Sequence, residues 1–348
     1  AVTDSPLVNF VKSRYYHSLA GQDSRNGGGL SMLLLPHPPM QLAGQLPANP
    51  EFPPTVVFAK DARRVEGAWI VADTATAWDL PVWIAHGVVD SIRLADHRFG
   101  RDRYIESETG QRPRNKAVYS GANGLGRWSE HVYYQLLNCG LRIPPTAGSG
   151  SGDTYSPVGY NRVYVYCDSE FSYESWFGGL RAGRVVVTNG PLLRPSVEGR
   201  PPGHVFQGEN GRTLRLQMDL QLATKDKIEY LELIQNGEIA VVVRLDEYVD
   251  RAGRLPPFEF SDSGWFLVRA VTDTAKTYRF ATSGPFYVEF ESRPRISHRA
   301  VRFFQDWVLQ RARQVAKLPD DAERSELIGY HRTARDYWRE LLARANAE

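Results

Sequence analysis

The sequence predicts a mixed α/β protein with three parts: an α/β body over residues 1–192, a small antiparallel β-sandwich over 193–292 and a helical tail over 293–348. Three observations predict this order. Short apolar runs alternate with helical patterns in the first part, a strict two-residue alternation takes over near residue 195, and an apolar helical period returns after residue 296.

The composition is that of a globular protein. Of the 348 residues, 42% are hydrophobic and 24% are charged, close to the average for soluble domains. The net charge of +2 disfavours a dedicated nucleic-acid-binding protein, which carries a concentrated basic excess. No apolar run approaches the roughly 20 residues of a membrane-spanning helix. A small-molecule substrate is compatible with this composition, which leaves the oligomeric state open.

The first part shows the alternation of strands and helices that is typical of a mostly parallel sheet, either open or closed into a barrel. Helices are predicted from proline-first and glycine-last boundaries or from a serine N-cap. The predicted strands are 31–37, 68–73, 90–96 and 161–168. The predicted helices are 54–67, 126–140 and 172–183.

The second part reads as antiparallel. Residues 214–223 alternate strictly between apolar and polar side chains, which predicts a half-buried strand. Asn236-Gly237 lies between two apolar runs and predicts a tight hairpin. Two further runs, 264–273 and 285–290, complete a small β-sandwich.

The third part predicts two helices that pack on the body. Pro319 separates them, and Asp320-Asp321 can cap the second helix. The apolar stripes consist of Val301, Phe304, Val308, Ala312 and Val315 in the first helix, and Leu327, Tyr330, Ala334, Tyr337 and Leu341 in the second.

The glycine-serine stretch AGSGSG, residues 147–152, raises the question of a binding loop. It has no lysine, which a nucleotide-hydrolase phosphate loop requires, and it precedes a strand, whereas the dinucleotide motif opens a helix. Two interpretations remain. The stretch is either a tight surface turn or a loop whose glycines let the backbone approach a ligand closely.

Several stretches together resemble the CehA/McbA (carbaryl-hydrolase-like) branch of the PHP-type metal-dependent hydrolases. They are RYYHSLAGQDSR (14–25), WDLPVWIAHGVVDSIRLADH (78–97), NCGLRIPPTAGSGSG (138–152), FSYESWFGGLRAGRVVVTNGPLL (171–193) and VEGRPPGHVF (197–206). The resemblance spans residues 10–290 in order, and GRVVVTNGPLL is its most specific part. It implies a distorted PHP-like (β/α) barrel with a metal centre at the strand ends, followed by a small β domain. The barrel would be incomplete at its N-terminus, because the sequence begins after the family's first strands.

The resemblance implies a metal site whose ligands are only partly present here. The family's early His-x-His pair is absent, and Gln22 followed by Asp23 stands where the family has a bridging glutamate. An amide is a much weaker ligand than a carboxylate. The family's late Asp-x-His element falls on Ser149, Gly150 and Ser151, which offer no strong ligand.

The candidate metal ligands that the resemblance leaves are His97, Asp96, Asp73, Asp23, Gln22 and His17. Imidazole and carboxylate groups would suit Zn, Mn or Fe, and such a metal lowers the pKa of bound water. Asp23 or Asp73 would serve as the general base. The structural alternative for each residue is a hydrogen-bonded turn after a strand.

A second set is expected to bind the substrate. Arg98, Asn161 and Arg162 would lie on the same face, where a guanidinium and an amide can hold an anionic or carbonyl oxygen. Ser149 and Ser151 would form the rim. The structural alternative is an ordinary salt bridge or turn.

Two functions from different classes follow. The first is a metal-dependent hydrolase of the CehA/McbA-like group that acts on an ester, carbamate or phosphoester through metal-activated water. The second is a catalytically inactive PHP-like relative that serves as a ligand- or carbohydrate-binding module; it is favoured by Gln22, the ligand-poor glycine run and the missing histidine pair. A third hypothesis combines them: the chain is a fragment, and the missing pair lies upstream.

Overall fold

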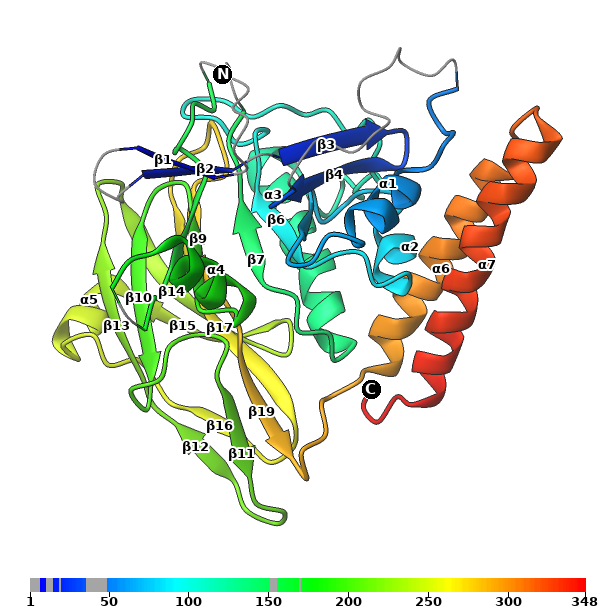
Figure 1. Cartoon of the computed structure of the whole chain (residues 1–348). Helices are drawn as coiled ribbons and strands as arrows, with labels where there is room; N and C mark the ends of the chain where they lie inside the picture. Colours follow the sequence, from blue (N-terminus) through cyan, green and yellow to red (C-terminus); the bar gives the residue numbers. More distant parts are fainter. Residues whose placement is uncertain (1–6, 11–14, 19, 36–48, 151–154, 169) are drawn as a thin grey trace.

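The computed structural model of the protein describes residues 7–10, 15–18, 20–35, 49–150, 155–168 and 170–348, and shows a mixed α/β fold (Figure 1). Its helices are α1 (Thr55–Ala62), α2 (Leu80–Ala85), α3 (Gly121–Asn138), α4 (Tyr173–Arg181), α5 (Leu245–Asp250), α6 (His298–Val315) and α7 (Asp321–Ala343).

The first half of the chain builds a five-stranded sheet in the order β3-β4-β5-β6-β7. Its strands are β3 (Ala20–Arg25), β4 (Gly28–Leu33), β5 (Trp69–Ala72), β6 (Ser91–Ala95) and β7 (Pro145–Ala147). The pairs β5–β6 and β6–β7 are parallel, whereas β3–β4 and β4–β5 are antiparallel. The sheet is therefore mixed, and less parallel than the strand–helix alternation predicted. The cause is the two-residue turn Asn26-Gly27, which closes β3 and β4 into a hairpin.

None of the sheets in the described residues closes into a barrel, so the PHP-like barrel is not confirmed. β7 lies beside β9 (Val185–Thr188) without pairing to it, which brings the edge of the five-stranded sheet against a second sheet. The predicted strand 161–168 appears as β8 (Arg162–Val165), and it pairs antiparallel with β9 in that second sheet.

The second sheet has eight strands. They run in the order β11-β19-β17-β18-β9-β8, and β14 pairs with both β17 and the edge strand β15. The bounds not yet given are β11 (Val205–Gly208), β14 (Ile228–Gln235), β15 (Glu238–Arg244), β17 (Gly264–Thr272), β18 (Phe280–Ser283) and β19 (Phe286–Phe290). Asn236 and Gly237 join β14 to β15 with φ of 52° and 91°, as the hairpin prediction requires.

Three short antiparallel pairs accompany these sheets. They are β1 (Leu7–Phe10) with β2 (Tyr15–Ser18), β10 (Leu192–Val197) with β13 (Met218–Ala223), and β12 (Leu214–Leu216) with β16 (Phe258–Phe260). One apolar core is built from the eight-stranded sheet together with the last two pairs, and includes Leu193, Met218, Leu231, Phe258, Phe266 and Phe286.

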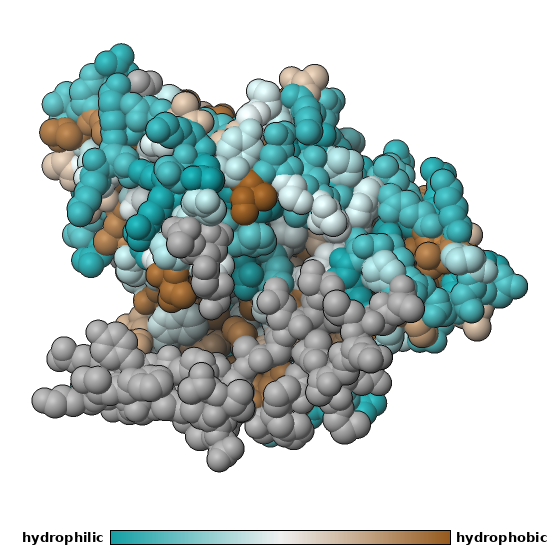
Figure 2. All heavy atoms as spheres, turned by 90° about the horizontal axis from the view of Figure 1, so that it is seen from above, coloured by the Kyte–Doolittle hydropathy of each residue, from teal (hydrophilic) through white to brown (hydrophobic). Residues whose placement is uncertain are grey.

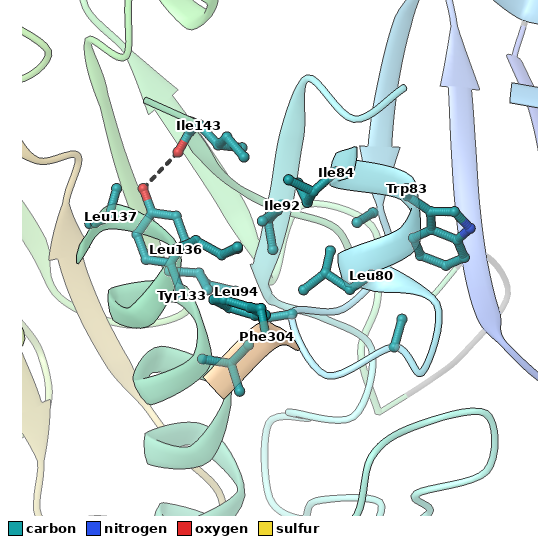
Figure 3. Close-up of a cluster of buried hydrophobic side chains, with 14 of the residues drawn as sticks. Leu80, Trp83, Ile84, Ile92, Leu94, Tyr133, Leu136, Leu137, Ile143 and Phe304 are labelled. Carbon is teal, nitrogen blue, oxygen red and sulfur yellow. Dashed lines mark hydrogen bonds between the residues drawn. The ribbon is translucent and has the colours of Figure 1, made fainter. Parts of the chain in front are cut away.

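The larger core joins the five-stranded sheet to α2, α3 and the C-terminal helices. Figure 3 shows part of it, with Leu80, Trp83 and Ile84 of α2, Ile92 and Leu94 of β6, Tyr133, Leu136 and Leu137 of α3, Ile143, and Phe304 of α6. The Tyr133 hydroxyl donates a hydrogen bond to the Ile143 carbonyl at 2.8 Å, so the buried phenol keeps a partner.

The helices α6 and α7 pack against each other and against α2, at the right of Figure 1. The indole N–H groups of Trp307 and Trp338 donate to the carbonyls of Trp78 and Pro81 at 3.0 Å each. The Arg311 guanidinium, which is 3% exposed, forms an ion pair with Asp79 at 2.8 Å. A second carboxylate, that of Glu51, accepts from the same guanidinium at 2.5 Å.

A buried ionic cluster attaches α3 to the eight-stranded sheet. Arg269 of β17 pairs with Glu130 of α3 at 2.5 Å and with Glu232 of β14 at 2.6 Å. The Tyr278 hydroxyl donates to Glu130 at 2.8 Å. Tyr278 also packs against Gly126 on α3, where a Cβ atom would lie 2.0 Å from the tyrosine ring. The helix can therefore approach the sheet only because residue 126 is glycine.

Among the helices of the described residues, none is long and apolar enough to cross a membrane. Seen from above, the described surface is mostly hydrophilic, with small separate groups of hydrophobic residues (Figure 2).

Candidate functional site

A pocket of about 300 Å³ lies at the carboxyl ends of β5 and β6. Asp73 directly follows β5, and Asp96 directly follows β6. Because these neighbouring strands are parallel, their carboxyl ends bring both side chains to one edge of the sheet. We call it the Asp73–Asp96 pocket. Its lining residues are Arg25, Gly28, Gly29, Asp73, Thr74, Arg93, Asp96, His97, Arg98, Ser107, Thr109 and Gln111.

Asp73 is held by an arginine and a serine. Its carboxylate pairs with the Arg93 guanidinium at 3.0 Å and accepts from the Ser31 hydroxyl at 2.6 Å. Arg93 also donates to that hydroxyl at 3.3 Å. Arg93 is 18% exposed in this arrangement, so its guanidinium reaches the pocket while its charge is balanced by Asp73.

Asp96 forms the most buried ion pair of the pocket. Its carboxylate lies 2.6 Å from Arg98 Nη2, and the two side chains are 1% and 2% exposed. Arg98 also donates through its backbone N–H to Asp96 at 2.9 Å and through Nη2 to Thr74 at 2.9 Å. Its Nη1 donates to Gln111. The donors of Arg98 are thus directed at protein acceptors, which makes Arg98 a positioning residue.

This pairing sets the ionisation of Asp96. Burial alone would raise the pKa of Asp96, but the charge and hydrogen bonds of Arg98 outweigh burial and hold that pKa below its ordinary value. At neutral pH Asp96 is therefore an anion with a guanidinium as its counterion.

His97 lines the same pocket and is exposed. The structure thus brings together four of the residues that the sequence singled out, namely Asp73, Asp96, His97 and Arg98.

The glycine-serine stretch borders this pocket from the side of β7. Gly148 packs on Arg93, because a Cβ atom at residue 148 would lie 2.6 Å from Arg93 Nε. The close approach anticipated for these glycines is therefore made to the guanidinium of the pocket. Ser149 has a structural contact: its hydroxyl accepts from the Asn161 backbone N–H at 2.9 Å. Ser151 lies outside the described residues.

Asn161 bridges the loop after β6 to the start of β8. Its side-chain amide donates to the carbonyls of Asp96 and Phe99 at 2.9 and 3.0 Å and to the Ser156 hydroxyl at 2.9 Å. Asn161 is 3% exposed, so it supports the loop that carries Asp96. Arg162 lines a different pocket.

The remaining predicted ligands lie on β2 and β3. His17 lies on β2, and the register of β3 places Gln22 and Asp23 opposite Ser31 and Leu30 of β4. The positions of these three side chains lie outside what the structure describes.

The described residues do not fit a metal ion. Within them, no group of three His, Cys, Asp or Glu side chains is placed to hold one. Both candidate carboxylates in the pocket instead have a guanidinium within 3.0 Å.

The sequence reasoning missed several lining residues, above all Arg93 and Gln111. Arg93 had a signal, because it is a charged residue inside the apolar strand SIRLA. Gln111 had none, since it lies in the non-periodic stretch between β6 and α3.

Comparisons of the chain with protein-family models, with curated proteins and with solved structures find no match, so no family is shown for it.

Proposed function

We propose that this chain is a PHP-like relative, similar to the CehA/McbA branch, that binds a small anionic, hydroxyl-rich ligand in the Asp73–Asp96 pocket without hydrolysing it. The proposal includes a distorted PHP-like barrel as the parent arrangement of the five-stranded sheet, with a β-sandwich after it. The contact between β7, the edge strand of the five-stranded sheet, and β9 of the eight-stranded sheet supports this arrangement.

One observation carries the proposal: the two described carboxylates that would hold a metal are instead paired with arginines, Asp73 with Arg93 at 3.0 Å and Asp96 with Arg98 at 2.6 Å. A buried carboxylate that has a guanidinium partner gains little from a metal, which would have to displace that partner and leave it buried without a counterion. The paired arginines therefore disfavour a metal ion in the pocket and favour a polar ligand.

The expected ligand follows from the lining. Arg93 is 18% exposed and lines the pocket, so its guanidinium can donate to an oxyanion in addition to Asp73. Ser107, Thr109 and Thr74 supply hydroxyl groups that donate to and accept from sugar hydroxyls. A volume of about 300 Å³ suits a ligand of monosaccharide size. A sugar acid or a related hydroxy acid combines these features.

The test is a thermal-shift titration with D-glucuronate, with D-glucose as the uncharged control. We expect glucuronate to raise the melting temperature and glucose to have little effect, because only glucuronate has a carboxylate for Arg93. Arg93→Gln should abolish the shift. The matched control is Arg63→Gln, because Arg63 also pairs with an aspartate, Asp90 at 2.6 Å, but lies outside the pocket.

The hydrolase remains the second candidate, because Asp73, Asp96 and His97 do converge at the strand ends, as a metal site of this family would require. Metal analysis by mass spectrometry separates the two functions. About one Zn, Mn or Fe per chain, lost in His97→Ala and accompanied by hydrolysis of an ester, carbamate or phosphoester, would support the hydrolase and overturn our proposal. A metal-free protein that still binds glucuronate would support the ligand-binding function.

A further inference from the structure

We propose that a second pocket, lined in part by Arg101 of the loop that follows β6, binds a small molecule carrying a pyrophosphate or two neighbouring phosphates. This cationic pocket has a volume of about 590 Å³. Its lining residues are Arg101, Tyr160, Arg162, Asn189, Gly190, Ala223, Thr224, Lys225, Asp226 and Arg279. The inference is independent of the function proposed for the Asp73–Asp96 pocket.

The charge of this pocket is unbalanced. Four cationic side chains, three arginines and one lysine, line it together with a single carboxylate among the described residues, that of Asp226. Asp226 is already paired with Arg279 at 2.6 Å. The charges of Arg101, Arg162 and Lys225 therefore have no counterion in the described protein.

Arg162 is preorganised for an anion. Its Nη1 donates to the Tyr160 carbonyl at 2.8 Å, its Nη2 to the Gly190 carbonyl at 3.3 Å and its Nε to the Tyr164 hydroxyl at 3.1 Å. These acceptors are all neutral, so they orient the guanidinium without cancelling its charge. A fixed guanidinium binds phosphate oxygens at a smaller entropic cost than a mobile one.

Arg279 is also held in place by several acceptors. It donates to the Tyr160 hydroxyl at 3.3 Å and to the Arg101 carbonyl at 2.5 Å, in addition to its ion pair with Asp226. Tyr160 thus contacts both arginines, since its carbonyl holds Arg162 and its hydroxyl holds Arg279. This network makes the cationic pocket a rigid site rather than a group of mobile surface charges.

Arg101 and Lys225 complete the site from two other loops. Both are exposed, and neither side chain has a hydrogen bond or ion pair within the described part of the chain. They are available to close on a ligand. The excess of three positive charges indicates the ligand class, because one phosphomonoester carries about −1.5 to −2 at neutral pH and two neighbouring phosphates would balance the pocket.

The experiment is isothermal titration calorimetry of the full chain with sodium pyrophosphate at low ionic strength, repeated with added NaCl. We expect saturable binding that weakens with salt. Arg101→Gln and Lys225→Gln should each weaken binding about tenfold, the loss expected for one charge-assisted hydrogen bond. Because neither side chain has a partner among the described residues, both variants should keep the melting temperature of the parent protein.

Two variants serve as controls. Arg302→Gln removes an exposed arginine from α6 and should leave pyrophosphate affinity unchanged. Arg93→Gln alters the Asp73–Asp96 pocket and should also leave it unchanged. The proposal is overturned by an absence of saturable binding at millimolar pyrophosphate. It is equally overturned by an equal loss in Arg302→Gln, which would indicate unspecific attraction, or by a loss confined to Arg93→Gln, which would place the anion in the other pocket.

Discussion

Arg98 and Asp96 are two residues apart in the chain and form an ion pair of 2.6 Å in which both side chains are at least 98% buried. Both residues line the Asp73–Asp96 pocket. Asp96 follows β6 and is a predicted metal ligand. In the structure the Arg98 guanidinium, and not a metal ion, is its counterion.

Asp96→Asn should destabilise the protein by about 3–5 kcal/mol, because it leaves the Arg98 charge buried without a counterion. Urea denaturation at neutral pH measures the change. The matched control is Asp246→Asn: Asp246 also pairs with an arginine two residues away, Arg244 at 3.0 Å, but both side chains are exposed. The control should have a nearly unchanged midpoint, and equal losses in both variants would contradict the role of burial.

The same pair predicts a pH dependence. The folded-state pKa of Asp96 lies below its unfolded value of 3.8, so its contribution to stability is complete above that value and is lost as the pH falls through the folded pKa. The stability difference between the parent protein and Asp96→Asn should therefore be constant from about pH 7 to about pH 5 and should shrink below about pH 4. A difference that grows on acidification would refute this assignment.

Alanine substitutions at two helical glycines should have opposite signs. Gly126→Ala places a Cβ atom 2.0 Å from the buried Tyr278 ring and should cost about 3 kcal/mol through overpacking. Gly178→Ala on α4 meets nothing within 4 Å and should stabilise the protein by about 0.5–1 kcal/mol, because alanine is the better helix former. Melting temperatures that shift in the same direction for both would show that the α3–sheet contact is looser than described.

Arg311→Met should loosen the C-terminal helices. The substitution leaves the carboxylates of Asp79 and Glu51 without their shared guanidinium, at an expected cost of about 3 kcal/mol. Arg313→Met is the control, since Arg313 is exposed on the same helix and no ion pair is recorded for it in the described structure. Limited proteolysis should cut the Arg311 variant earlier between residues 298 and 343, and the Arg313 variant no earlier than the parent.

The two cysteines should differ in reactivity. Cys139 is 1% exposed, and burial raises its pKa, so little reactive thiolate is present near neutral pH. Cys167 is half-buried, and both thiols are free. A chromogenic disulfide reagent should modify Cys167 first in the native protein and Cys139 only after denaturation. Cys167→Ser should remove the fast reaction, and a fast reaction that persists in that variant would contradict the burial of Cys139.

The sequence was most informative where local patterns decide the structure. The strands before Asp73 and Asp96 were predicted from short apolar runs, and the parallel pairing of β5 and β6 then brings both carboxylates together. The partners of those carboxylates were not predicted, because Arg93 meets Asp73 only across the paired strands. Spacing along the chain does not encode such a contact.

Strand pairings between segments distant in the sequence also could not be predicted. The alternating run 161–168 predicted a strand, but its pairing with β9 depends on which sheet offers a free edge. The hairpin of β3 and β4 could have been found from Asn26-Gly27, a strong turn signal that lies between two runs of weak strand character. The weakness of those runs, rich in glycine and polar residues, explains why the turn was overlooked.

The packing of α6 and α7 against residues 78–81 has a consequence for folding during synthesis on the ribosome. Trp307 contacts Trp78 across 229 residues, and Trp338 contacts Pro81 across 257. The apolar surface around α2 therefore stays exposed until α6 and α7, near the end of the described chain, have been synthesised. Contacts between residues so distant in the sequence slow folding and prolong the lifetime of aggregation-prone intermediates. We expect the nascent chain to depend on chaperones until residue 338 has emerged.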